Sequence, residues 1–333
     1  MEIDEKSKEI VDIKNEVEEE VKKFRKTITK DPCQKYFLSQ GAVEHKWDDE
    51  DVYIDALYQG YLDACRTISW NSKANEKGKK LLEEKKEWDD KKGKSTKENP
   101  MRKPLKTVAG ELQKYFTEEE NKEPFNKKHS EWCEKLIKDY SSYLDEELTY
   151  GQAQKIINMA FKYLYCIFDA KEKLEEKKER FKYCHMPLDK FSLEWVKRYF
   201  FSTNNEYWEK SREENFKKGN VQSWSTMGKE NYENKGYGYN TYSRNIGEYC
   251  IREYDEQISP LQLDFVIWTK MQKIMAAEAF IKTFQEEDDK WVQKAIGCEK
   301  YDIGNLNEIL EKRLIKIRPL ICDGIDSTIC KKK

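Results

Sequence analysis

The chain has 333 residues, of which 38% are charged and 38% are hydrophobic. Its 62 basic and 64 acidic residues nearly cancel, leaving a net charge of −2, which argues against a protein that binds nucleic acid through a general positive surface. The aromatic content of 13% is too high for a chain that is disordered throughout, and it supplies enough bulky side chains to build a core.

Cysteine usage and hydropathy indicate the compartment. Nine cysteines are spread along the chain without a Cys-x-x-Cys pair, an odd number that is typical of reduced thiols and not of a disulfide framework. The first residues lack the basic and apolar regions of a secretory signal, and no stretch approaches the roughly 20 apolar residues that a membrane span requires. We therefore expect a cytoplasmic protein that does not enter a membrane.

The first third of the chain combines amphipathic helices with charged segments. Residues 4–27 carry apolar side chains at helical spacing, and residues 50–70 repeat this pattern more strongly. Residues 71–104 are rich in Lys and Glu and end in two Pro-containing turns, which predicts a helix that frays into an exposed linker. We therefore expect an N-terminal helical region over residues 1–104, with a domain boundary near its end.

The sequence that follows predicts a main helical domain over residues 105–320. Residues 107–116 and 129–144 are expected to form helices. Residues 149–168 are the most apolar helical segment of the chain, and we expect this helix at the centre of the core. Residues 170–182 are highly charged and are also predicted to be helical.

Residues 202–247 differ in composition from the rest of the chain. They are rich in Asn, Gly, Ser, Tyr and Trp without a persistent period, which predicts a long irregular loop. The aromatic residues from Trp224 to Tyr254 have two interpretations. Together with Arg244 and Arg252 they could line a groove for DNA bases, or they could simply attach the segment to the core. The near-neutral local charge favours attachment to the core.

The C-terminal part predicts two further helices and a tail. A helix is expected over residues 260–284, because a proline occupies its first position and Ser259 with Gln262 can form a capping box. A last helix is expected over residues 305–316, followed by a tail at 321–333. Strand patterns are weak and no internal repeat is present. The sequence therefore predicts an all-α fold, a multi-helix orthogonal bundle with a long aromatic-rich loop.

Two charged residues in the middle of the chain suggest chemistry. Lys155 lies near the start of the otherwise apolar helix, where an apolar environment would disfavour the ammonium and favour a nucleophilic amine. Asp189 follows a Pro-containing turn and precedes a predicted helix, so it is placed to cap that helix and to remain ionised. A fixed carboxylate of this kind can stabilise positive charge that develops on a sugar.

The two segments together resemble the helix-hairpin-helix DNA glycosylases, over residues 148–196. The run from Gly151 to Lys155 is similar to the hairpin and catalytic lysine of that family, with one glycine where the family usually has two. The run from Pro187 to Asp189 is similar to its Pro-x-Asp turn. The resemblance implies that Lys155 attacks the sugar C1′ atom and that Asp189 assists departure of a damaged base. It also implies double-stranded DNA as a partner, with contacts from Gly151, Gln152 and Gln154.

Each of these residues also has a structural interpretation. Lys155 could extend its amine to solvent from a buried stem, and Asp189 could serve as a helix cap alone. Lys162, on the same predicted helix, is a second candidate nucleophile. The alternative function is a non-enzymatic helical protein that binds a partner, in a mobile-element or defence setting, with the same core and without catalysis.

Neither a metal site nor a cofactor site is predicted. Cys184 and His185 are adjacent, but the chain has only three histidines and no further ligand at a metal-binding spacing. Gly236 and Gly238 are not followed by the Gly-Lys-Ser/Thr element of a phosphate-binding loop.

Overall fold

The computed structural model describes residues 5–29, 49–90, 99–118, 124–169, 179–200, 223–230 and 237–296. Within these ranges every regular element is a helix, and the one β-type pairing is an isolated bridge between Ala74 and Leu144. The prediction of an all-α, multi-helix fold is therefore confirmed. Each helix in the described part of the chain is too short or too polar to traverse a lipid bilayer.

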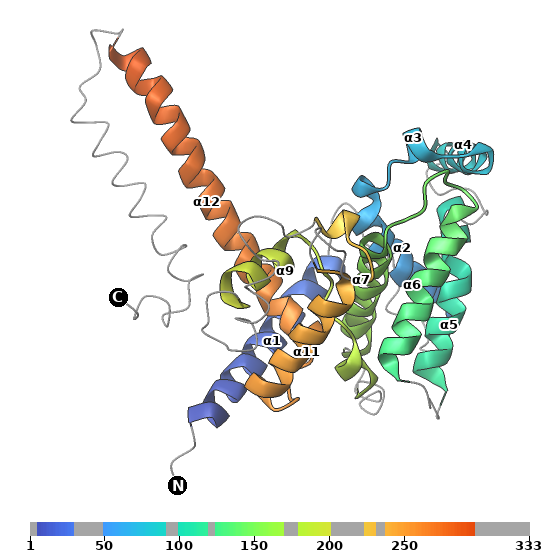
Figure 1. Cartoon of the computed structure of the whole chain (residues 1–333), viewed down its shortest axis with the longest axis horizontal. Helices are drawn as coiled ribbons and strands as arrows, with labels where there is room; N and C mark the ends of the chain where they lie inside the picture. Colours follow the sequence, from blue (N-terminus) through green and yellow to red (C-terminus); the bar gives the residue numbers. More distant parts are fainter. Residues whose placement is uncertain are drawn as a thin grey trace. The chain divides into compact units, whose positions relative to one another are not determined.

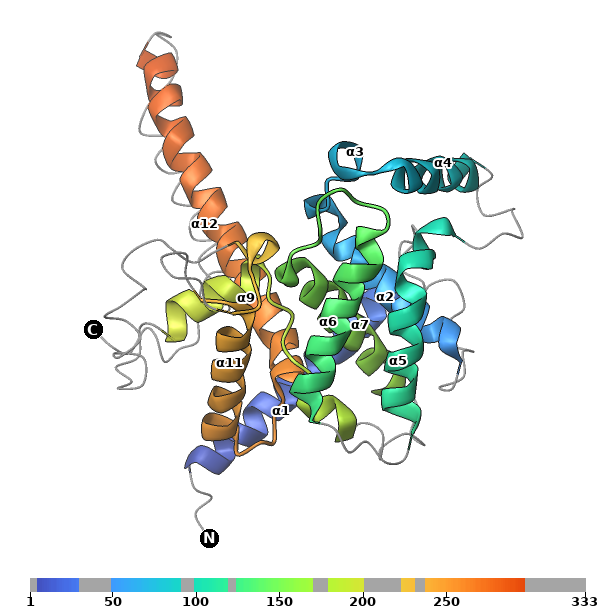
Figure 2. The same cartoon turned by 45° about the vertical axis from the view of Figure 1, so that its right-hand side comes forward.

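The chain divides into two compact units, Met1–Phe265 and Val266–Lys333. Figure 1 shows α7 between α1 and α11 on one side and α2, α5 and α6 on the other, and Figure 2 again places α7 at the centre of the first unit. The α-helices are α1 (Glu5–Thr29), α2 (Glu50–Ala64), α3 (Trp70–Lys73), α4 (Glu76–Asp90), α5 (Lys106–Thr117), α6 (Phe125–Ser141), α7 (Tyr150–Asp169), α9 (Lys190–Trp195), α11 (Tyr239–Tyr254) and α12 (Pro260–Ile296). Short 3-10 turns are η3 (Cys65–Thr67), η4 (Pro100–Leu105), η6 (Glu179–Tyr183) and η8 (Trp224–Thr226), and η7 (Val196–Phe200) is a π-helical turn.

Helix α7 is the core helix that the sequence predicted. Its apolar side chains are buried against α1, α2 and α6. The approach of α2 is close enough that a Cβ atom on Gly60 would overlap the backbone carbonyl oxygen of Ile156. Gly60 therefore allows the two helix backbones to touch, which a larger residue would prevent.

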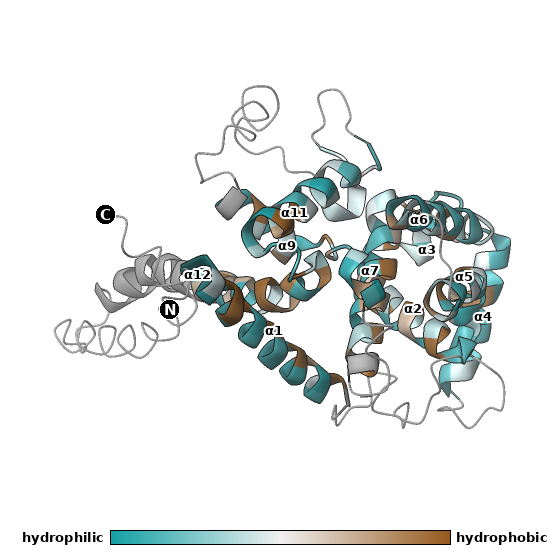
Figure 3. Ribbon diagram, turned by 90° about the horizontal axis from the view of Figure 1, so that it is seen from below, coloured by the Kyte–Doolittle hydropathy of each residue, from teal (hydrophilic) through white to brown (hydrophobic). Residues whose placement is uncertain are grey.

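Helix α1 covers another side of α7 with an apolar stripe. Ile10, Val17, Val21 and Ile28 are buried, while most of the intervening residues face solvent. Figure 3 shows hydrophilic and hydrophobic residues alternating along α1, as expected for an amphipathic helix at a surface.

The predicted exposed linker within residues 71–104 differs from the structure. Pro100, Met101 and Leu105 are buried, so the η4 turn is part of the core and not a free connection. The predicted boundary near residue 104 falls inside the first compact unit, because residues on both sides of it pack together there. The Lys- and Glu-rich composition concealed this short apolar run.

Two predicted helix limits also change. Helix α2 stops at Ala64 and not near residue 70, because the Thr67 hydroxyl donates to the Ala64 carbonyl oxygen (2.8 Å) and the chain tightens into η3. Helix α12 has the predicted capping box. The backbone amide of Gln262 donates to the Ser259 hydroxyl (3.2 Å), and the backbone amide of Ser259 donates to the side-chain oxygen of Gln262 (2.9 Å). It continues to Ile296, beyond the predicted end.

Part of the predicted irregular segment 202–247 is helical. Helix α11 begins at Tyr239, and its buried residues Tyr242, Ile246 and Cys250 recur at helical spacing. The Asn, Ser and Gly residues between them hid this period. The rest of the predicted loop, at 202–222 and 231–236, lies outside the described residues, as do the predicted helix 305–316, the tail 321–333 and most of the predicted helix 170–182.

Candidate functional site

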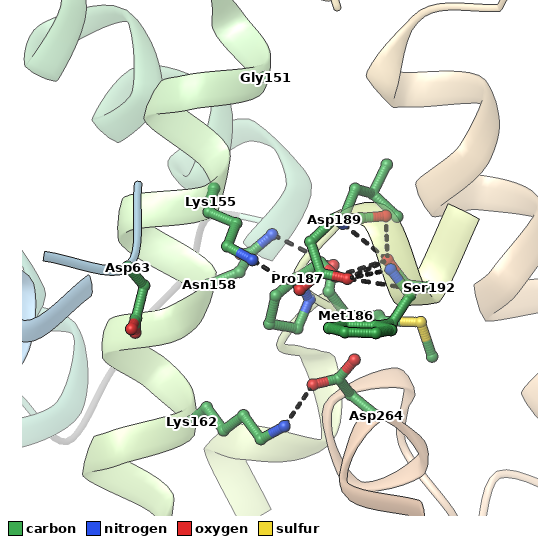
Figure 4. Close-up of polar contacts among 12 residues, drawn as sticks. Asp63, Gly151, Lys155, Asn158, Lys162, Met186, Pro187, Asp189, Ser192 and Asp264 are labelled. Atoms are coloured by element: carbon green, nitrogen blue, oxygen red, sulfur yellow. Dashed lines mark hydrogen bonds and ion pairs between the residues drawn. The ribbon is translucent and has the colours of Figure 1, made fainter. Parts of the chain in front are cut away.

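Lys155 and Asp189 form a buried ion pair, although 34 residues separate them along the chain. The Lys155 Nζ atom lies 2.6 Å from Asp189 Oδ2, and the two side chains are only 8% and 10% exposed. Figure 4 shows them pointing toward one another from α7 and from the start of α9. The structure therefore brings together the two residues that the sequence proposed as catalytic.

The Asp189 carboxylate is fixed by the start of α9. Its Oδ1 atom accepts hydrogen bonds from the amides of Phe191 (2.8 Å) and Ser192 (3.1 Å), and the Asp189 amide donates to the Ser192 hydroxyl (2.7 Å). The predicted N-cap is thus confirmed, as a full capping box. Burial alone would raise the pKa of this carboxyl, but the Lys155 ammonium and the backbone hydrogen bonds lower it below its usual value. The carboxylate therefore stays ionised.

The Lys155 amine also faces the indole of Trp224, with 5.2 Å between Nζ and the ring centroid. The η8 turn that carries Trp224 is attached to the start of α7. The Thr149 hydroxyl donates to the Ser225 carbonyl oxygen (2.8 Å), and the Gly151 amide donates to the Met227 carbonyl oxygen (2.9 Å). A Cβ atom on Gly151 would overlap the Trp224 carbonyl oxygen. Gly151 therefore allows the backbone of the η8 turn to pack directly against the start of α7.

The start of α7 is occupied by protein groups. The backbone amide of Gln152 donates to the Thr149 hydroxyl (3.1 Å), and the backbone amide of Ala153 donates to the Thr149 carbonyl oxygen (3.1 Å). The Gln152 side chain donates to the Thr67 carbonyl oxygen (2.8 Å). A helix N-terminus binds phosphate through unoccupied N–H groups. The amides of Gly151, Gln152 and Ala153 are already bonded within the protein.

Gln154 joins the Pro-x-Asp turn to α7 from the inside. Its side chain is fully buried, donates to the carbonyl oxygens of Gly151 and Leu188 (2.9 Å each), and accepts from the Leu188 amide (3.2 Å). Asn158, one turn further along α7, donates to the Gln154 oxygen (3.0 Å). Gln154 is therefore an interior residue that positions the turn before Asp189.

The two arginines proposed for DNA contact lie on α11. The Arg244 side chain is 62% exposed and lies 4.0 Å from Glu248, and the Arg252 side chain is 50% exposed and pairs with Glu253 at 2.6 Å. Both are accessible to a partner, and each has an acidic neighbour on its own helix.

A second ion pair lies two turns further along α7. Lys162 Nζ is 2.6 Å from Asp264 Oδ2, and the side chains are 1% and 3% exposed. The ammonium lies over the rings of Phe24 (5.1 Å) and Phe265 (4.6 Å), and burial raises the pKa of the Asp264 carboxyl. Lys162, the second candidate nucleophile, is thus enclosed. Asp264 was not predicted from the sequence, although a single acid within an apolar helix start signals a buried partner.

One more acid lies near these pairs. Asp63, at the end of α2, accepts a hydrogen bond from the Tyr163 hydroxyl (2.9 Å). Figure 4 shows it on the opposite side of Lys155 from Asp189. The residue is exposed, but the surrounding protein partly desolvates its carboxyl and so raises the pKa.

Two neutral histidines continue the network beyond Asn158. His129 Nε2 lies 2.8 Å from Asn158 Oδ1, and the side-chain Nδ2 of Asn158 donates to the Tyr239 hydroxyl (2.9 Å). That hydroxyl lies 2.8 Å from His185 Nδ1. Burial lowers the pKa of His129 to about 4 and holds that of His185 well below its usual value. Within the described ranges, no three His, Cys, Asp or Glu side chains gather closely enough to hold a metal ion.

Relatives give no guide to the role of this site. No protein-family model matches the chain, and no curated protein or solved structure matches it significantly. The function of Lys155 and Asp189 must therefore be argued from their own geometry.

Proposed function

We propose that this chain is a DNA glycosylase/lyase-like enzyme that acts on damaged or modified bases through Lys155 and Asp189. The observation that carries the proposal is the 2.6 Å contact between an amine near the start of one helix and a carboxylate at the cap of another. A lysine nucleophile beside a fixed, ionised carboxylate supplies the two groups that this reaction requires.

The reaction begins with separation of the ion pair. An ammonium that donates to a carboxylate has no lone pair, so Lys155 first releases a proton to solvent when substrate enters. The neutral amine then forms a bond from its Nζ atom to the sugar C1′ atom. The glycosidic bond from C1′ to the base breaks, its electron pair leaves on the base, and the base takes up a proton from solvent. Asp189 stabilises the positive charge on the sugar during this step. The nitrogen of the adduct then loses a proton and its lone pair forms the C1′=N bond of the Schiff base. The C1′–O4′ bond breaks in the same step, and O4′ keeps the electron pair and takes up a proton from solvent.

The substrate base must leave the DNA stack to reach a buried amine. The exposed Arg244 and Arg252 on α11 support phosphate binding. Gly151, Gln152 and Gln154 support the site in another way, by holding η8 and the Pro-x-Asp turn against α7.

A second candidate function is a non-enzymatic helical protein that binds a partner. The Lys162–Asp264 pair favours it, because the same helix there carries an ion pair that is enclosed by protein and joins α7 to the start of α12. On this alternative the Lys155–Asp189 pair is a second internal connection, between α7 and α9.

Borohydride trapping separates the two functions. Wild-type protein mixed with duplex DNA that contains an abasic site should give a covalent adduct on reduction, mapped to Lys155 by mass spectrometry. Lys155→Met should abolish the adduct, while Lys190→Met, which changes an exposed lysine beside Asp189, should retain it. Asp189→Asn keeps a helix-capping oxygen and should weaken trapping without unfolding the protein.

Circular dichroism of each variant distinguishes lost chemistry from lost folding. The absence of any adduct with the wild type, or an undiminished adduct with a folded Lys155→Met protein, contradicts the enzyme function and leaves the binding protein.

A further inference from the structure

The residues around the Lys155 amine differ in their exposure to solvent. Lys155 and Asp189 are each only 7% exposed, whereas Trp224 is half-buried. Of the two groups that contact the amine, Trp224 is therefore the more exposed.

The groups around the amine also differ in how firmly they are held. Asp189 is fixed by the amides of Phe191 and Ser192 and by the Ser192 hydroxyl. The backbone of η8 is fixed by Thr149 and Gly151, but the indole itself is joined to that backbone by two rotatable bonds. We expect a molecule that approaches the amine to displace the indole more readily than the carboxylate.

We infer that Trp224 determines substrate specificity at Lys155, selecting compounds that carry a planar ring next to the carbon under attack. The inference rests on the proposed function, because it takes Lys155 as the nucleophile. An approaching carbon must replace the contact between the ammonium and the indole face. A planar ring beside that carbon can stack on the indole and restore the lost contact, whereas an acyclic group cannot.

A nucleoside in DNA has the required form. Its base is a planar ring bonded directly to C1′, the atom that the amine would attack. Trp224 therefore favours a base-bearing nucleotide over a sugar that has already lost its base. It places the ring of the base on the exposed side of the site, toward solvent and the incoming DNA.

Small aldehydes test this inference without DNA. The full-length protein is incubated with pyridine-3-carboxaldehyde or with butanal, reduced with cyanoborohydride, and digested so that mass spectrometry measures labelling at Lys155. The ratio of aromatic to aliphatic labelling at exposed Lys190 in the same digest corrects for the intrinsic reactivity of the two aldehydes. We expect the corrected ratio at Lys155 to be about fivefold or more in the wild type, since stacking favours the aromatic aldehyde.

Three variants complete the experiment. Trp224→Phe should keep most of the preference, because it retains an aromatic face, and Trp224→Leu should reduce the corrected ratio to about one. Gly151→Ala should reduce it as well, because the added methyl displaces η8 while the indole remains in the chain. If Gly151→Ala does not fold, the contrast between Phe and Leu at position 224 decides the matter.

The outcomes separate the inference from the proposed function. Labelling of Lys155 with the same corrected ratio in wild type and Trp224→Leu overturns the role of Trp224 and leaves the nucleophile intact. No labelling of Lys155 by either aldehyde, while Lys190 is labelled, removes the nucleophile and the inference together.

Discussion

At the scale of single residues, the two oxygens of Asp189 have separate partners. Oδ1 accepts the amides that begin α9, and Oδ2 accepts the ammonium of Lys155. The cap therefore holds the carboxylate whether or not the lysine is charged. Among the described hydrogen bonds, no backbone amide donates to the Asp264 carboxylate, which lies past the first turn of α12 and pairs with Lys162.

This difference predicts unequal costs when the lysines are removed. Lys162→Met leaves the Asp264 carboxyl buried without its cation, and we expect a loss of about 3–5 kcal/mol in the free energy of unfolding. Lys155→Met should cost less, because the amides of α9 continue to solvate Asp189. Urea unfolding followed by circular dichroism measures both values.

The matched control is Lys182→Met, which breaks an exposed pair with Glu179 and should leave the unfolding midpoint unchanged. The double variant Lys162→Met/Asp264→Leu should recover most of the loss, since it removes the unpaired charge. Equal costs for Lys155→Met and Lys162→Met would show that the cap does not support Asp189 independently.

At the scale of secondary-structure elements, the site depends on where α7 lies. Helix α2 fixes α7 through the backbone contact at Gly60, η8 sits on its first turn at Gly151, and α9 begins opposite Lys155. Two of these three contacts require the absence of a side chain. A glycine inside a helix is normally unfavourable, so its presence in α2 reflects the close approach of α7.

Two glycine substitutions test this argument. Gly60→Ala places a methyl group against the Ile156 carbonyl oxygen and should destabilise the protein by about 1–3 kcal/mol. Gly247→Ala, in α11, meets no atom within 4 Å and should stabilise it by about 0.5–1 kcal/mol, the ordinary gain in a helix interior. Thermal unfolding of the two variants gives the signs. A stabilising Gly60→Ala would mean that α2 and α7 are further apart than described.

The sequence predicted these elements unevenly, for physical reasons. Apolar periodicity located α1 and α7, and a capping signature located Asp189 and the start of α12, because these signals are local. The partner of Lys162 lies 102 residues away, and such a pairing depends on tertiary packing that no local pattern encodes. Lys162 was considered only as a second candidate nucleophile, and no counterion was predicted for it.

The same limit explains the hairpin. The segment from Gly151 to Gln154 was similar to a DNA-binding motif in its residue types, but those types also suit internal hydrogen bonding. Only the structure shows that Gly151 contacts the backbone of η8 and that the Gln154 side chain is buried. The convergence of Lys155 and Asp189 was expected from a family resemblance, and their individual positions from helix signals.

At the scale of the whole molecule, stability is linked to pH through the buried polar network. His129 and His185 are neutral in the folded protein, where burial depresses the pKa of each. When the chain unfolds, both side chains return to an ordinary pKa near 6.5 and take up protons more readily. Acid therefore favours the unfolded chain, and the network of Asn158 and Tyr239 is lost with it.

The pH window follows from the shift at His129. Its pKa is about 4 in the folded state and 6.5 in the reference state, so its contribution is complete above pH 6.5 and is lost as the pH falls toward 4. We expect the free energy of unfolding to fall by about 3 kcal/mol across this interval from His129 alone, with a further loss from His185. The raised pKa of Asp264 acts in the opposite direction, because the folded state takes up that proton more readily.

Urea unfolding at intervals from pH 7.5 to pH 4.5 measures the sum of these contributions. His129→Gln, which retains a donor to Asn158, should flatten the dependence of the free energy of unfolding on pH. A slope unchanged by His129→Gln would assign the acid sensitivity to His185 or to the Asp189 carboxyl, whose pKa is lowered in the folded protein.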